Sequence, residues 1–111
     1  MNGLDRTLAA LADPTRRGVV ELLRRRPQRA GELADALGMS APALSRHLRV
    51  LRESGLVLEE VDREDARARV YTLEPQPFDA LRRWVEDVEA FWRGELDAFR
   101  THAERTRGRR R

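Results

Sequence analysis

Residues 31–57 read GELADALGMSAPALSRHLRVLRESGLV and outline two short amphipathic helices separated by a turn. In the first helix, apolar residues recur at helical spacing, and Gly38 can adopt the left-handed conformation that ends a helix. Ser40 can cap the second helix, where Pro42 is tolerated because first-turn N–H groups have no intrahelical partner. Gly55 ends the second helix. The outline predicts a helix-turn-helix.

The second helix of this stretch divides into an apolar stripe and a polar, cationic face. At about 100° per residue, Leu44, Leu48 and Leu51 share one stripe, and small and charged residues lie opposite or beside it. Small residues allow close approach to the major groove, which arginine side chains can read. We therefore expect DNA contacts from Ser40, Pro42, Ala43, Ser45, Arg46, His47 and Arg49.

We expect different contacts from the three charged or titratable residues of this face. Arg46 is placed to bind O6 and N7 of guanine, whereas Arg49, a turn further along, is better placed for a phosphate. The alternative is that both are solvated surface charges. His47 lies about 60° from the leucine stripe, which suits a packed structural histidine as well as one that contacts DNA.

Composition restricts the class of protein. The 111 residues, of which 41% are hydrophobic, suffice for one small domain. There is no cysteine, hence no disulfide and no thiolate metal site, and no apolar run approaches the roughly 20 residues that span a bilayer. The N-terminus lacks the pattern of a signal peptide. We expect a cytoplasmic protein without membrane contact.

The placement of charge is more informative than its sum. All 22 basic residues are arginine, against 19 acidic residues, so the net charge of +3 is small. Acidic residues concentrate at 59–65 and 86–97, whereas arginines flank the helix-turn-helix. These flanking arginines are Arg16, Arg17, Arg24, Arg25, Arg26 and Arg29.

Two scaffold helices are predicted before the motif. Leu4, Leu8 and Leu11 outline the first. Asp13 can cap the second, which runs to about Arg26.

A β-hairpin is predicted directly after the motif. Residues 56–61 and 67–73 read as two strands, joined by DREDA at 62–66. Such a hairpin is a wing whose tip could reach a neighbouring groove or phosphate. Its acidic residues would be repelled by DNA, so its arginines must offset them. We expect Arg63 or Arg67 to contact a phosphate, with a solvated turn as the alternative.

A long helix is predicted from near Phe78, after Glu74-Pro75-Gln76-Pro77 breaks the chain. Its apolar stripe is wider than a two-helix seam needs, so one edge has no partner within so small a domain. We expect a second copy to supply one, and the alternative is a core helix within one chain. The stripe comprises Leu81, Trp84, Val85, Val88, Phe91, Trp92, Leu96, Phe99 and Ala103.

The chain as a whole resembles the ArsR family of bacterial winged helix-turn-helix repressors over residues 4–104. The resemblance is carried by LADPTRRGVVELL at 11–23, ELADALGMSAPALSRHLRVLRESGLV at 32–57 and RARVYTL at 67–73. It implies a mainly α fold with a β-hairpin wing, in which the long C-terminal helix and the first helix pair two copies. The dimerisation residues implied are Leu4, Leu8, Leu81, Trp84, Val88, Phe91, Trp92, Leu96 and Phe99.

Two departures from the family pattern bear on function. Family wings often have glycine where Ala66 stands, so a left-handed turn is less easy there. Metal-sensing members use cysteine pairs, or histidine and carboxylate clusters on the last helix, and this chain has neither. His47 and His102 lie on different predicted helices, and the spacing of Asp97 and His102 does not put both on one face. We expect no metal and no cofactor.

The resulting expectation is a homodimeric, sequence-specific repressor of transcription that binds an inverted repeat in double-stranded DNA. Residues 1–104 would form the DNA-binding and dimerisation domain, and residues 105–111 a basic, disordered tail. The family implies release by an inducer, and a small molecule could bind between aromatic walls formed by Trp84, Phe91 and Trp92, although such a stripe also suits plain core packing.

Two other classes of function fit the sequence less well. A winged-helix module that binds proteins without reading bases is the alternative, and the arginines of the second motif helix count against it. An enzyme is disfavoured because the chain has no cysteine, no Gly-x-Ser-x-Gly elbow and no phosphate-binding loop.

Overall fold

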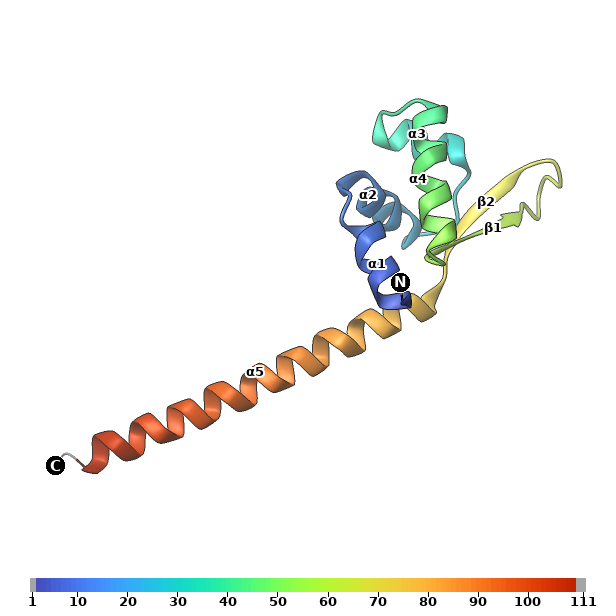
Figure 1. Cartoon of the computed structure of the whole chain (residues 1–111). Coiled ribbons are helices and arrows are strands. Elements are labelled where there is room, and N and C mark those ends of the chain that lie inside the picture. Colours follow the sequence, from blue (N-terminus) through green and yellow to red (C-terminus); the bar gives the residue numbers. More distant parts are fainter. Residues whose placement is uncertain (1, 110–111) are drawn as a thin grey trace. The chain divides into compact units, whose positions relative to one another are not determined.

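The computed structural model describes residues 2–109, which fall into two compact units divided between Asp79 and Ala80 (Figure 1). The first unit extends to Asp79, and the residues from Ala80 onward form the second, helical unit. The elements are α1 (Gly3–Leu11), α2 (Pro14–Leu23), α3 (Ala30–Leu37), α4 (Ala41–Glu53), β1 (Val57–Val61), β2 (Arg69–Leu73) and α5 (Pro75–Arg109).

The first two helices begin at side-chain caps. Asn2 accepts from the backbone N–H of Asp5 at 2.8 Å, and the Asp13 carboxylate accepts from two backbone N–H groups at the start of α2. One predicted boundary is wrong, because α2 ends at Leu23 rather than near Arg26. The helix predicted from Leu4, Leu8 and Leu11 is confirmed as α1, in which Thr7 and Ala10 are buried. Leu4 and Leu11 are half-buried there, and Leu8 is exposed.

The predicted helix-turn-helix is formed by α3 and α4 (Figure 1). Gly38 has φ +64°, and its left-handed conformation lets the N–H of Met39 bond back to the Ala34 carbonyl at 3.0 Å. The Ser40 hydroxyl accepts from the N–H of Ala43 at 3.3 Å, as expected of a cap. Gly55, with φ +78°, follows the end of α4.

The core of the first unit fixes the orientation of α4. Leu44, Leu48 and Leu51 are all buried, which confirms the predicted stripe. Each buried leucine contributes about 1.5–3 kcal/mol of hydrophobic stabilisation, so rotating α4 about its axis would be costly. The other buried apolar residues are Ala10, Val19, Leu23, Leu33, Ala34, Leu56 and Val57.

The wing is the antiparallel pair β1 and β2, in register from Val57 opposite Leu73 to Val61 opposite Arg69. Both strands begin one or two residues later than predicted. The hairpin tip closes without a left-handed residue, since no described residue other than glycine has positive φ. Instead the carboxylates of Asp62 and Asp65 each accept a backbone N–H two residues ahead, so Ala66 does not need a glycine's freedom.

The last helix begins earlier and ends later than the sequence predicts. Pro75 and Pro77 lie in the first turn of α5 rather than in a break, because no intrahelical N–H is required there. α5 continues to Arg109, past the predicted start of a disordered tail at 105, and residues 110–111 lie outside the described residues. None of the described helices is long and apolar enough to cross a membrane.

The second unit carries a run of exposed, large apolar side chains. A single helix has no interior, and most of the predicted stripe is exposed, while Leu81 and Ala103 are half-buried. The exposed residues are Trp84, Val85, Val88, Phe91, Trp92, Leu96 and Phe99.

Candidate DNA-binding surface

The outer face of α4 carries the residues predicted to contact DNA. Pro42, Ser45, Arg46 and Arg49 are exposed, and Ala43 is half-buried beside them. Because the opposite side of α4 is locked into the core, these side chains must project away from the unit. The face is therefore rigidly presented, which is the arrangement that a helix entering the major groove requires.

Arg46 and Arg49 are not engaged by acidic neighbours. Among the described residues, no ion pair or hydrogen bond involves either guanidinium, although the fold contains many arginine–carboxylate pairs. Their donors are thus available to an external acceptor such as a base edge or a phosphate.

His47 is more enclosed than its neighbours on α4. Its side chain is 23% exposed, and its Nδ1 lies 3.9 Å from a carboxylate oxygen of Asp13 and 3.5 Å from Nη1 of Arg16. This arrangement agrees with the first of the two alternatives from the sequence, a packed structural histidine. A DNA contact from His47 stays a prediction.

Asp13 and Arg16 join three helices around this histidine. Arg16 donates from Nε to the Ala10 carbonyl at 2.7 Å and from Nη2 to the Ala9 carbonyl at 3.3 Å, which satisfies the C-terminus of α1. The N–H of Arg16 donates to Asp13 and lowers the pKa of that carboxyl, with a further contribution from the N–H of Thr15. The arrangement fixes the start of α2 against α1 and α4.

Several acidic residues of the wing are paired with arginines. Glu59 lies 2.7 Å from Arg52 of α4 and 3.8 Å from Arg69. Asp65 lies 3.5 Å from Arg67, whose side chain is 94% exposed. The phosphate repulsion expected from the sequence is thereby reduced, and Arg67 remains accessible to DNA.

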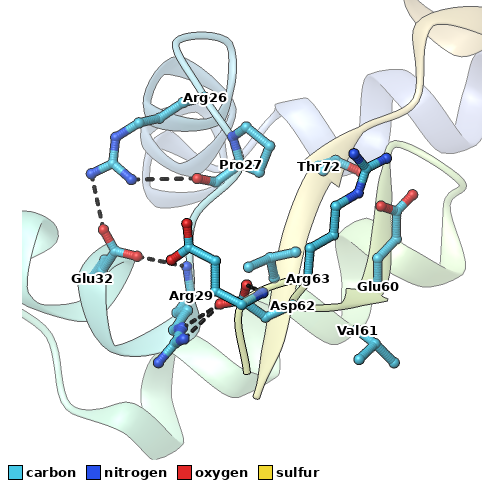
Figure 2. A pocket seen from close by; sticks show the side chains of 11 residues that line it. Arg26, Pro27, Arg29, Glu32, Glu60, Val61, Asp62, Arg63 and Thr72 are labelled. Carbon is cyan, nitrogen blue, oxygen red and sulfur yellow. Dashed lines mark hydrogen bonds and ion pairs between the residues drawn. The ribbon is translucent and has the colours of Figure 1, made fainter. Parts of the chain in front are cut away.

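A cleft of about 690 Å³ separates the start of α3 from the wing (Figure 2). Arg29 and Asp62 line this cleft and are in direct contact, with Nε and Nη2 of Arg29 donating to one carboxylate oxygen of Asp62 at 2.9 and 2.6 Å. The N–H of Glu64 and the Arg29 guanidinium both lower the pKa of Asp62. On the same wall, Arg26 is paired with Glu32 at 2.9 Å.

Sequence reasoning did not identify Arg29 and Asp62 as a pair. They are 33 positions apart, and neither belongs to a local motif that specifies a partner. From the sequence, the acidic residues of the loop at 62–66 predict only repulsion of DNA.

Potential metal ligands do not gather on the described residues. No group of three histidine, aspartate or glutamate side chains within that part of the chain could hold a metal ion.

Comparison with known proteins identifies the family. A family model described as "Bacterial regulatory protein, arsR family" matches residues 13–58, which extend from the cap of α2 into β1. The chain is also 44% identical over 95 residues to the HTH-type transcriptional regulator Rv2034 of Mycobacterium tuberculosis (strain ATCC 25618 / H37Rv), covering 86% of this chain and 83% of that protein. The chain belongs to the ArsR family.

Further similarities of this ArsR-family chain agree with the fold. It is 39% identical over 93 residues to the arsenical resistance operon repressor of Escherichia coli (strain K12), covering 78% of this chain and 70% of that protein. A solution structure of the homodimeric winged helix-turn-helix DNA-binding domain Mb0332 from Mycobacterium bovis matches with a TM-score of 0.63 at 24% identity and covers 79% of each chain. The winged helix-turn-helix predicted from the sequence is confirmed, and the ArsR-family chain is a transcriptional regulator with a DNA-binding domain of this kind.

Proposed function

We propose that this ArsR-family regulator is a sequence-specific repressor that binds an inverted-repeat operator as a homodimer and does so without a metal ion. One observation carries the proposal: Arg46 and Arg49 are exposed, form no ion pair or hydrogen bond through their guanidinium groups within residues 2–109, and lie on a helix whose other side is buried. In this assignment Arg46 donates to guanine in the major groove, and Arg49 binds a phosphate.

The homodimer is supported by the apolar face of α5. Its exposed residues include two tryptophans and two phenylalanines, and an aromatic surface of this kind is stabilised when a partner removes it from water. The Mycobacterium bovis protein of similar fold is described as homodimeric. Two recognition helices related by a two-fold axis would enter major grooves about 34 to 36 Å apart, which calls for an inverted repeat.

Metal independence is supported by the residues available as ligands. The chain has no cysteine, and its two histidines lie on α4 and α5.

Repression is the role named for the Escherichia coli relative. A dimer that occupies promoter DNA through two helices can exclude other proteins from the same grooves.

A gel-shift titration tests the proposal. The DNA is the segment upstream of the chain's own gene, compared with a shuffled duplex of equal length over a series of salt concentrations. We expect tighter binding to the upstream segment, with the logarithm of affinity falling linearly with the logarithm of salt concentration. Equal affinity for both duplexes would overturn sequence-specific reading and favour a protein-interaction module.

A further inference from the structure

The ion pair between Arg29 and Asp62 joins two parts of the fold that have different roles in DNA binding. Arg29 immediately precedes α3 of the helix-turn-helix, and Asp62 immediately follows β1 of the wing. The Asp62 side chain is only 15% exposed, and two nitrogens of Arg29 converge on its Oδ2 atom (Figure 2). This fork geometry restricts orientation more than a single contact would.

Both partners of this pair are themselves held in place. The other carboxylate oxygen of Asp62 accepts the N–H of Glu64 at 2.9 Å, so one side chain orders the hairpin tip and anchors it. The backbone N–H of Arg29 donates to Glu32 at 3.2 Å, and the adjacent Gln28 exchanges two backbone hydrogen bonds with Tyr71. The backbone of Arg29, which is the partner of Asp62 on the helix-turn-helix side, is therefore held in place by these hydrogen bonds.

The position of Asp62 along the hairpin gives the pair its effect. The contacts of Arg52 with Glu59 and of Gln28 with Tyr71 hold one level of the wing, because Glu59 and Tyr71 are opposite each other in the register. Asp62 lies three residues closer to the tip, or about 10 Å along an extended strand. A two-stranded hairpin is marginally stable alone, so its outer part depends on contacts of this kind.

We propose that the Arg29–Asp62 pair is the positioning contact that holds the wing in its DNA-binding orientation. Asp62, although acidic, then supports DNA binding through the placement of Arg63 and Arg67, whereas electrostatics alone would make it oppose binding. The inference rests on the proposed function and adds to it a role for two residues that do not touch DNA.

The test measures operator affinity for Asp62→Asn, Arg29→Ala and the double variant at one salt concentration. We expect each single change to weaken binding by about two- to five-fold. The double variant should lose no more affinity than the single variant with the larger loss, because both changes remove the same contact. Arg26→Ala is the matched control, because it removes a cation and an ion pair from the same cleft without touching the wing. Arg26→Ala should change the operator affinity less than Arg29→Ala or Asp62→Asn does.

The direction of the Asp62→Asn effect separates positioning from simple charge. The substitution removes a negative charge beside DNA, so unchanged or tighter binding would overturn the proposal. Weaker binding by Arg29→Ala together with tighter binding by Asp62→Asn would mean that Arg29 itself contacts DNA, which also overturns it.

A second measurement separates positioning from general stability. In the Arg63→Ala/Arg67→Ala background, Asp62→Asn should cause no further loss of affinity, because the wing arginines are already absent. A loss that persists there would overturn the proposal. Failure of the proposed function is distinguishable, since it appears in the unmodified protein as equal binding to operator and shuffled DNA.

Discussion

At the scale of single residues, the proposed function gives different roles in DNA binding to two arginines one turn apart on α4. Arg46→Ala should cost about 1–3 kcal/mol of operator binding and relax the preference for one base pair. Arg49→Ala should weaken binding to all sequences alike and reduce the salt dependence by about one unit of slope. Binding assays on the operator and on single-base variants measure both. Equal losses on operator and shuffled DNA for both variants would contradict these assignments.

Asp13 should contribute to stability as a helix cap. Asp13→Ala leaves two N–H groups at the start of α2 without their acceptor and should lower the free energy of unfolding by about 1–2 kcal/mol. Asp13→Asn keeps an oxygen in the same place, so urea denaturation should show a smaller loss. If both variants were equally destabilised, the charge facing His47 and Arg16 would matter more than the cap.

The same carboxylate makes stability depend on acid pH. The folded-state pKa of Asp13 is lowered, chiefly by the N–H of Arg16, so folding favours the ionised form. This contribution is present above the ordinary aspartate pKa of about 3.9 and is lost as pH falls through the lower folded-state value. Urea midpoints measured from pH 6 downward should therefore fall more steeply for the unmodified protein than for Asp13→Asn. Parallel curves would contradict this.

At the scale of elements, the turn between α3 and α4 depends on one backbone conformation. Gly38→Ala should cost about 1 kcal/mol, because φ is +64° there. Gly31→Ala within α3 is the matched control. A Cβ would meet nothing within 4 Å at either position, so only the backbone differs, and Gly31→Ala should be neutral or stabilising. Thermal unfolding compares them, and equal destabilisation would refute the argument.

Local signals in the sequence predict most of these elements. Gly38, Ser40 and the leucine stripe each act within one or two turns, and all three predictions are confirmed. Errors arise where a local rule has two outcomes: Pro75 can break a chain or begin a helix. No local signal predicts the Arg29–Asp62 pair, because only the tertiary fold brings together residues that are 33 positions apart.

At the scale of the whole molecule, the apolar face of α5 should decide the oligomeric state. Phe91→Glu places a charge in that face and should shift the protein from dimer toward monomer at micromolar concentrations. Ala90→Glu adds the same charge at the preceding position, which lies about 100° from Phe91 and nearly opposite the centre of the apolar face, and should leave the dimer intact. Light scattering coupled to gel filtration measures the mass. A monomeric unmodified protein would contradict the proposed homodimer.

The way α4 is mounted separates folding from recognition. Its first turn is capped by Ser40, the left-handed Gly55 follows its end, and three buried leucines fix its orientation, while its outward positions contribute nothing to the core. New side chains at 45, 46 and 49 can therefore be exchanged as a set with little penalty to the scaffold. Under the proposed function, substitutions at these few exposed positions would direct the regulator to a different promoter, and duplicated genes can diverge in the same way.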